Sequence, residues 1–198
     1  MAKHPAISVT LDDAALAKAL RALSRRDKRL AQAIRFAGPL PERSLSRGFA
    51  TLVKIIVEQQ LSLAAAAAIQ ARLEAEIGVV TPDTVLSRDV AHLRALGLGA
   101  RKAEYIQGIA GALQTGDLDL VRIRQLSDAE AITHLTAIRG IGPWTAEVYL
   151  LFAEGRSDIF PAGDIALQAA AQFSFDLPGR PGTDALREMA EDWRPWRG

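Results

Sequence analysis

Apolar residues recur along this chain at the three- and four-residue spacing that is typical of helices. A helix over residues 46–59 would place five of them on one inward face: Phe49, Leu52, Val53, Ile56 and Val57. No segment shows the strict alternation of apolar and polar residues that predicts a strand. The pattern therefore predicts an all-α fold.

Cap and turn residues divide the pattern into separate helices, because serine, threonine and aspartate start helices while glycine and proline end them. Thr81 and Pro82 open a short helix, and Ser24, Ser62 and Ser87 are expected to cap three others. With these three included, and apart from the short helix at Thr81-Pro82, helices are expected near residues 10–22, 24–37, 46–59, 62–77, 87–96, 100–113, 128–139, 143–154, 164–173 and 183–193.

Two helices joined by a Gly-rich turn are predicted in the second half of the chain. Ser127 and Glu130 have the spacing of a capping box, which predicts a helix start at Asp128. Gly140 is expected to end that helix after Arg139, because glycine tolerates a left-handed backbone.

The turn Gly140-Ile141-Gly142 leads into Pro143, which suits the first position of a second helix. That helix start would point its amides outward from a Gly-rich turn and so form an anion site for a phosphate. A plain helical hairpin that only packs uses the same residue types. Spacing alone leaves both interpretations open.

A single acid, Asp164, follows Pro161-Ala162-Gly163 at a predicted helix start. A carboxylate held in a fixed position can stabilise positive charge that develops on a substrate during a reaction. Aspartate is also a frequent N-cap. Position alone favours the cap, so a catalytic role for Asp164 depends on the surrounding motif.

Composition narrows the class of protein. The 198 residues are enough for one domain or two small lobes, and no apolar stretch is long enough to span a membrane. No signal-peptide pattern is present, so we expect an intracellular protein, either cytoplasmic with the bacterial nucleoid or nuclear. The absence of cysteine excludes disulfides and an iron–sulfur cluster.

The net charge of +1 is small for a nucleic-acid binder and indicates a local basic face rather than a basic tail. Each candidate cation also fits a solvated helix surface, so the hypothesis depends on their grouping near predicted helix junctions. The candidates are Arg43, Arg47, Lys54, Arg101, Lys102 and Arg139.

No other chemistry finds support in the sequence. The three histidines lack metal-ligand spacing. No GxxxxGK[ST] run supports nucleotide hydrolysis, and no serine-centred nucleophile elbow is present.

The hairpin sequence with Asp164 downstream resembles the helix-hairpin-helix DNA glycosylase superfamily. The resemblance rests on Leu-x-x-Ile-x-Gly-Ile-Gly-Pro-Trp-Thr-Ala at residues 135–146 and on Phe-Pro-Ala-Gly-Asp at residues 160–164. Segments 55–62, 96–106 and 193–197 resemble further blocks of the superfamily, in the same order. The closest likeness is to the alkylation-repair branch, the DNA-3-methyladenine glycosylase II type.

The resemblance implies a two-lobed all-α fold with the active cleft between the lobes. One lobe would hold residues 1–40 and 160–198, and the other residues 45–155 with the hairpin at 128–154. Together they would form a single glycosylase domain over residues 1–198, which we expect to be a monomer.

The implied activity is that of a monofunctional DNA glycosylase that excises alkylated bases, such as 3-methyladenine and 7-methylguanine, from duplex DNA. Superfamily members that also cut the strand carry a lysine where this chain has Trp144, because an amine is needed for a Schiff base. We therefore expect no lyase activity and no required cofactor. A helix-hairpin-helix module that binds DNA without cleaving it, and a mismatch or uracil glycosylase, remain as alternatives.

The resemblance also implies roles for individual residues. Asp164 would be the catalytic carboxylate, and the base pocket would be lined by Trp144, Tyr105, Tyr149 and Phe160. A tryptophan ring suits a cationic base, although Trp144 also fits simple core packing.

Base flipping leaves a gap in the duplex that a side chain must fill. By resemblance this wedge comes from the junction Gln59-Gln60-Leu61, with Gln60 in the gap and Leu61 beside it, although an ordinary helix break explains the same residues. Other DNA contacts would come from Lys102, Gly140, Gly142 and Thr145, and a structural Na⁺ or K⁺ would bind the backbone carbonyls of Thr136, Ile138 and Ile141.

Overall fold

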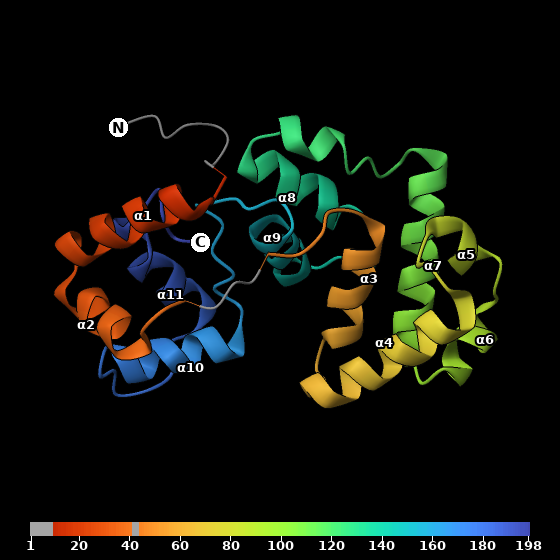
Figure 1. The fold of residues 1–198 in the computed structure, drawn as a ribbon, viewed down its shortest axis with the longest axis horizontal. Coiled ribbons are helices and arrows are strands. Elements are labelled where there is room, and N and C mark those ends of the chain that lie inside the picture. Colours follow the sequence, from red (N-terminus) through yellow and green to blue (C-terminus); the bar gives the residue numbers. More distant parts are fainter. Residues whose placement is uncertain (1–9, 41–43) are drawn as a thin grey trace. The chain divides into compact units, whose positions relative to one another are not determined.

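The computed structural model describes residues 10–40 and 44–198, which are mainly helical (Figure 1). Within these ranges there is no strand, and one isolated bridge pairs Thr10 with Arg156. The all-α prediction is confirmed. The helices are α1 (Asp13–Arg26), α2 (Lys28–Ala37), α3 (Phe49–Glu58), α4 (Leu63–Ile77), α5 (Pro82–Leu86), α6 (Val90–Ala95), α7 (Ala100–Thr115), η1 (Arg122–Gln125), α8 (Asp128–Thr136), α9 (Pro143–Phe152), α10 (Ile165–Ser174), α11 (Thr183–Met189) and η2 (Glu191–Trp193).

The chain divides into two compact units. Unit 1 comprises residues 1–44 and 150–198, and unit 2 comprises residues 45–149. The second boundary falls inside α9, earlier in the chain than the lobe boundary that the resemblance implied. The active cleft expected between the lobes stays a prediction. None of the described helices is long and apolar enough to cross a membrane.

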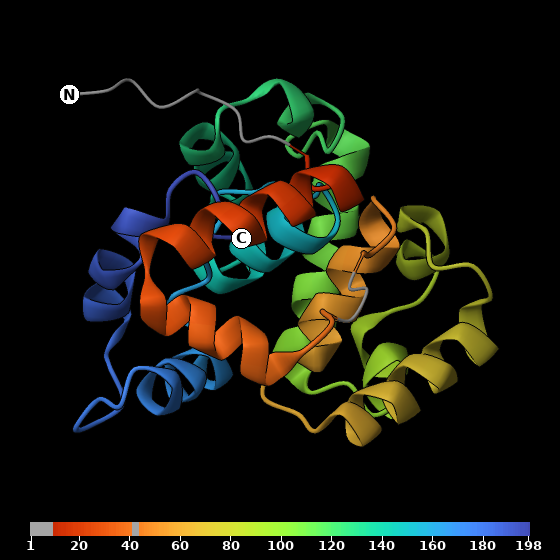
Figure 2. The ribbon, with the colours of Figure 1, turned by 60° about the vertical axis from the view of Figure 1, so that its left-hand side comes forward.

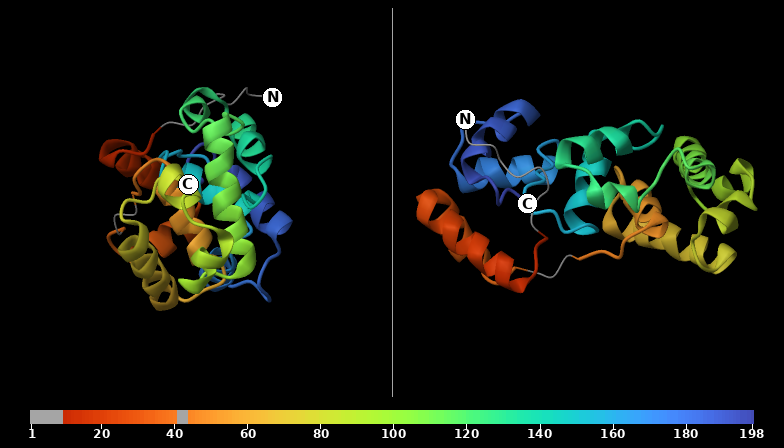
Figure 3. Two further views of the ribbon diagram at one scale, coloured as in Figure 1. Left: turned by 90° about the vertical axis from the view of Figure 1, so that its right-hand side faces the viewer. Right: turned by 90° about the horizontal axis from the view of Figure 1, so that it is seen from above.

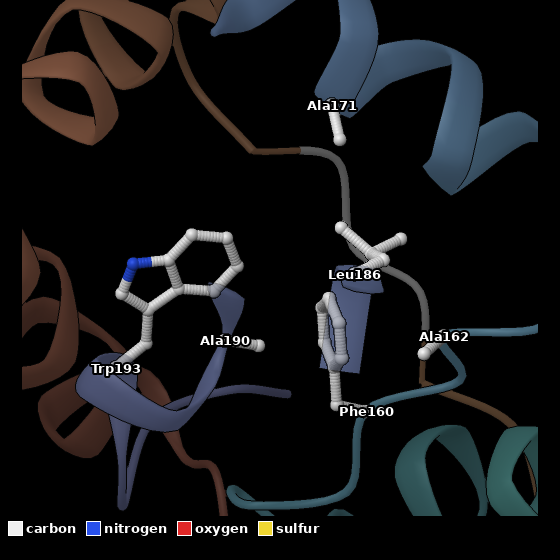
Figure 4. Packing of buried hydrophobic residues seen from close by; sticks show 6 residues of the cluster. All are labelled: Phe160, Ala162, Ala171, Leu186, Ala190 and Trp193. Atoms are coloured by element: carbon white, nitrogen blue, oxygen red, sulfur yellow. The ribbon is translucent and has the colours of Figure 1, made fainter. Parts of the chain in front are cut away.

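Unit 1 is built from α1, α2, α10 and α11, with α1 and α2 joined by a short turn and α10 beside α2 (Figure 2). Its core consists of alanine, leucine and aromatic side chains that pack together (Figure 4). Leu23, Leu30, Leu167 and Phe175 cover this cluster from the side. The buried members are Phe160, Ala162, Ala171, Leu186, Ala190 and Trp193.

Unit 2 is organised around α3, which is buried on almost every side. Helix α7 packs against α3, α5 and α6, and it runs next to α3 in Figure 3. A helix that is apolar all round belongs in a core. The five residues that the sequence placed on the inward face of this helix are all buried: Phe49, Leu52, Val53, Ile56 and Val57.

Some predicted helix starts are confirmed and others are wrong. The Ser62 hydroxyl accepts the Ala65 amide at 3.2 Å and caps α4 as predicted. Neither Ser24 nor Ser87 starts a helix, because Ser24 lies inside α1 and Ser87 ends α5 as its C-cap. Asp27 and Asp89, which follow them, are the N-caps of α2 and α6. Serine and aspartate cap helices about equally well, so the sequence offered two candidates at each start and no rule to choose.

Other boundaries also differ from the prediction. Helix α3 begins at Phe49 rather than residue 46, because Gly48 before it has a φ of 112°, outside the helical region. The last predicted helix ends at Met189 and continues as η2, and the short helix η1 was not predicted at all.

Candidate nucleic-acid interface and catalytic acid

The first helix of the hairpin begins as predicted and ends early. The Ser127 hydroxyl accepts the Glu130 amide, and the Glu130 carboxylate accepts the Ser127 amide at 2.9 Å, so the capping box is confirmed. Helix α8 then stops at Thr136, not at Arg139 as predicted. The backbone bonds switch there to a tighter spacing, since the Ile138 amide donates to the Leu135 carbonyl at 3.1 Å.

Gly140 has no room for a side chain. Its φ is +100°, which disfavours any residue with a Cβ. A Cβ placed on Gly140 would lie 2.5 Å from both Cβ and Cγ of Tyr105. Tyr105, predicted as a pocket residue, therefore lies against the hairpin turn from its position on α7. The turn needs glycine at residue 140 for two independent reasons.

The second glycine of the turn has a different environment. A Cβ placed on Gly142 would meet no atom within 4 Å, and both Gly142 and Pro143 are exposed. The Gly142 carbonyl accepts the Ala146 amide at 3.0 Å, which opens α9. The start of α9 thus faces outward from the turn, as an anion site requires. Its contact with DNA backbone stays a prediction.

The residues predicted to hold a monovalent cation surround the same turn. Thr136 ends α8, and Ile138 and Ile141 lie within the turn, where the Ile138 carbonyl accepts the Ile141 amide at 3.0 Å. A carbonyl oxygen has two lone pairs, so this bond leaves it capable of binding an ion. The three backbone oxygens fit Na⁺ or K⁺ in chemical type, and the cation itself stays a prediction.

The turn that follows α3 has a strained centre. Gln60 has a φ of +56°, a left-handed conformation that costs a residue with a side chain roughly 1–2 kcal/mol. Gln60 is exposed, and Leu61 beside it is 41% exposed. Side chains predicted to enter the gap in a duplex therefore lie at the surface of unit 2.

A hydrogen bond from the Gln59 side chain connects this turn to the hairpin. The side-chain amide of Gln59 donates to the Thr145 hydroxyl at 2.8 Å, and Thr145 lies in the first turn of α9. Thr145 is only 2% exposed, so a direct contact between its hydroxyl and DNA gains no support. The two residues instead connect the two predicted DNA-binding elements of unit 2.

Lys102 was predicted to contact DNA, but in the structure its ammonium group binds backbone carbonyls of unit 2. Its ammonium group donates to the carbonyls of Val57 and Gln59 at 2.7 and 2.6 Å. Partial burial lowers the pKa of Lys102 below its ordinary value, because the charged form loses solvation. The ammonium binds the carboxyl end of α3, and a phosphate contact from Lys102 gains no support.

Asp164 caps α10, and its carboxylate is fixed. One oxygen, Oδ1, accepts the amides of Ala166 and Leu167 at 2.8 and 3.1 Å. Asp164 remains half-buried rather than enclosed. The cap interpretation is therefore confirmed, and it is compatible with the catalytic one, since a fixed and partly exposed carboxylate is what stabilisation of a positive charge requires.

Sequence reasoning missed the residue that supports the turn before Asp164. Gln168 is buried, and its amide nitrogen donates to the Ala162 carbonyl at 2.9 Å. The Asp164 amide donates to the Pro161 carbonyl at 2.8 Å and closes the turn. Gln168 follows Asp164 by one helical turn, and this spacing is the one signal that could have identified it.

A buried ionic cluster holds the start of the same segment. Asp158 is 7% exposed and accepts hydrogen bonds from the guanidinium groups of Arg194 and Arg197, the latter at 2.8 Å. Arg197 also donates to Glu191 at 2.9 Å. These arginines belong to the Trp-Arg-Pro-Trp-Arg segment at residues 193–197, whose role in unit 1 is therefore structural.

The predicted pocket aromatics fall into two groups. Phe160 is buried in the core of unit 1, where its ring meets Trp193 edge-on with centroids 5.8 Å apart. Tyr149 is fully buried, and its hydroxyl accepts the Gly48 amide at 3.1 Å. Neither gains support as a pocket residue. Trp144 and Tyr105 are half-buried and keep their predicted roles as hypotheses.

The candidate cations of the basic face have different environments. Arg43 lies outside the described residues. Lys54 and Arg101 are exposed, and the exposed side chain of Arg139 lies 3.7 Å from the Glu104 carboxylate. In the described ranges no group of three His, Asp or Glu side chains gathers that would hold a metal ion.

Two helices joined by a tight Gly-Ile-Gly turn, followed by a capping carboxylate on the next helix, define the helix-hairpin-helix class of proteins. The family model of the HhH-GPD superfamily base excision DNA repair proteins matches residues 53–195. This span contains the hairpin, the turn after α3 and Asp164. The chain belongs to this superfamily, and the resemblance read from its motifs is confirmed.

Curated relatives and solved structures agree with this assignment. The chain is 31% identical over 189 residues to DNA-3-methyladenine glycosylase 1 of Schizosaccharomyces pombe. The matched region covers 92% of this chain and 83% of that protein. It is 35% identical over 153 residues to the Bacillus subtilis protein YfjP, covering 73% of this chain and about half, 53%, of that relative's length. The S. pombe 3-methyladenine DNA glycosylase, solved in complex with abasic DNA, matches with a TM-score of 0.82 at 30% identity and 91% coverage of each chain.

Proposed function

We propose that this protein is a monofunctional DNA glycosylase that removes alkylated bases, of the 3-methyladenine and 7-methylguanine type, from duplex DNA. The substrate class is taken from the relatives named as DNA-3-methyladenine glycosylases. An alkylated purine already carries positive charge, so it leaves the sugar without a protonating acid. The protein then has to stabilise the sugar cation and admit water.

The observation that carries this proposal is the fixed carboxylate of Asp164 at the start of α10. Two backbone amides hold its Oδ1 atom, and the buried Gln168 holds the turn before it. As the bond between C1′ and the base nitrogen breaks, its electron pair leaves with the base and positive charge grows on the sugar. A carboxylate held beside C1′ lowers the energy of that state without reorganising. Water then adds to C1′ and gives up a proton.

Unit 2 carries the features that would bind the duplex. The exposed start of α9 presents amides suited to a phosphate, and the exposed turn around Gln60 presents a side chain suited to the gap that a flipped base leaves. Gln59 and Thr145 connect the two features directly. This connection supports double-stranded DNA as the partner, with the damaged base as the point of contact.

The hairpin supplies no amine for strand cleavage. Residue 144 is tryptophan, and Lys102 is the last lysine in the sequence, so none lies in or after the hairpin. A Schiff base between enzyme and sugar needs a lysine or a terminal amine. We therefore infer that the product is an intact strand with an abasic site.

The test is base release from methylated duplex DNA, with strand cutting scored before and after alkali. The proposal expects free 3-methyladenine or 7-methylguanine, and nicks only after alkali treatment. Tight DNA binding without any base release would instead identify a non-catalytic DNA-binding module. Release of uracil or of a mismatched base, with methylated bases left in place, would identify a mismatch or uracil glycosylase.

A further inference from the structure

The backbone of the turn at residues 59–61 is strained, and contacts with other parts of unit 2 must stabilise it. Gln60 is the only non-glycine residue besides Asp176 with a positive φ among the described residues. A left-handed glutamine persists only where the surrounding structure fixes its backbone. The backbone bonds of the turn itself are weak, since the Leu61 amide reaches the Glu58 carbonyl at 3.3 Å.

Two side chains from other helices hold the residues before Gln60. Lys102 of α7 donates to the carbonyls of Val57 and Gln59, at the last turn of α3. Thr145 of α9 accepts the side-chain amide of Gln59. Helix α7 runs beside α3 within unit 2 (Figure 3), which brings the Lys102 side chain to the last turn of α3.

The end of α3 is a favourable place for an ammonium group. The last carbonyls of a helix have no partner within the helix and carry the negative end of its dipole. Lys102 is half-buried and uses two of its three N–H donors on these carbonyls. Moving to a phosphate would break two charge-assisted bonds at once.

We infer that Lys102 is a positioning residue, which holds the end of α3 so that the turn 59–61 presents Gln60 in its left-handed conformation, and that it makes no contact with a DNA phosphate. The inference rests on the proposed function, because presenting Gln60 matters only if the turn enters a duplex. It assigns to Lys102 a role different from that of its exposed neighbour Arg101.

The first experiment compares Lys102→Met with Arg101→Met by the salt dependence of binding to an abasic duplex. Each variant removes one positive charge at the start of α7, and methionine keeps most of the aliphatic stem. A lost phosphate contact lowers the slope of log Kd against log salt by about 0.9. We expect Lys102→Met to keep the wild-type slope, whatever Arg101→Met does. A decrease of about 0.9 in Lys102→Met would overturn the inference.

The second experiment measures base release from duplex and from single-stranded methylated DNA. Lys102→Met should lower release from the duplex by about tenfold, the factor that one charge-assisted hydrogen bond is worth. Release from the single strand should change by less than about twofold, because no gap has to be filled there. Equal losses on both substrates would contradict a role in presenting Gln60.

Amide hydrogen exchange keeps the inference testable without activity. Exchange at residues 59–61 should be at least about tenfold faster in Lys102→Met, while the core of α3 stays protected. Unchanged exchange at the turn would overturn the inference. If Lys102→Met does not fold, Thr145→Val removes the other tie to Gln59 and should produce the same local change. Wild-type protein that releases no base would refute the proposed function and leave this exchange test intact.

Discussion

Gly140 of the hairpin turn lies directly against Tyr105 of α7, so closely that a Cβ on Gly140 would come within 2.5 Å of two Tyr105 atoms. The Arg139 guanidinium covers the same ring from 5.9 Å. The hairpin turn therefore packs against a half-buried aromatic side chain. The shape of the turn depends on this contact as well as on the positive φ of Gly140.

Gly140→Ala should weaken both the fold and DNA binding. A Cβ at this position meets Tyr105 and also forces an unfavourable positive φ, so we expect a loss of about 2–3 kcal/mol in unfolding free energy. Affinity for duplex DNA should fall at least about tenfold because the turn is displaced. Urea unfolding and fluorescence anisotropy measure the two effects.

Gly142→Ala is the matched control for that variant. A Cβ on Gly142 would meet nothing within 4 Å, and the residue has no positive φ. Stability should therefore change by less than about 1 kcal/mol. An equal loss of stability in both variants would contradict the account of the Tyr105 contact.

Asp158→Asn should destabilise unit 1 strongly. The Asp158 and Arg197 side chains are 9% and 10% exposed, and asparagine leaves the two guanidinium groups without their buried anion, with only the exposed Glu191 as a charged partner. Removing one partner of a buried ion pair costs about 3–5 kcal/mol. Thermal and urea unfolding should detect this, with base release falling only as the folded fraction falls.

The control for Asp158 is Glu191→Gln in the same cluster. The Glu191 side chain is 50% exposed, so solvent screens its bonds to Arg194 and Arg197. We expect a loss below about 1 kcal/mol. If Glu191→Gln were as damaging as Asp158→Asn, burial would not be the reason for the effect.

The capping box of α8 predicts a pH dependence. Hydrogen bonds from the Ser127 side chain and backbone lower the pKa of Glu130 below its ordinary value of 4.5. A lowered carboxyl pKa adds stability that is complete above about pH 4.5 and is lost as the pH falls through the folded-state pKa. Glu130→Gln should therefore be less stable than wild type at pH 7, and the difference should shrink at pH 3. A difference independent of pH would exclude the carboxylate charge as its source.

Much of the fold followed from the sequence because α3 and the hairpin carry strong local signals. The apolar face of α3 and the capping box at Ser127 are both confirmed. Helix ends were harder, since α8 stops at Thr136 through a change in backbone bonding that no residue type announces. The cap predicted at Ser24 was wrong because Asp27, three residues later, caps that helix.

The contacts of the candidate site residues were harder to predict than the helices. Motif position indicated a functional role for Asp164 and Lys102 alike. In the structure, Asp164 accepts hydrogen bonds from two amides of its own helix, whereas Lys102 donates to the carbonyls of Val57 and Gln59, 45 and 43 positions earlier in the chain. A contact over that separation leaves no periodic trace in the chain. Asp158 was missed for the same reason, since its arginine partners lie 36 and 39 positions later. Gln168 was missed because its role depends on burial, which a single polar residue does not reveal in the sequence.

The most direct test of the central claim is the single-turnover rate of base release by Asp164→Asn on methylated duplex DNA. Asparagine caps a helix as well as aspartate does, so unfolding free energy should stay within about 0.5 kcal/mol of wild type. The account predicts that the rate falls about 100-fold or more, with duplex affinity retained, because the negative charge that stabilises the sugar is gone. A variant that is equally stable and releases base at the wild-type rate would contradict the assignment of Asp164 as the catalytic carboxylate.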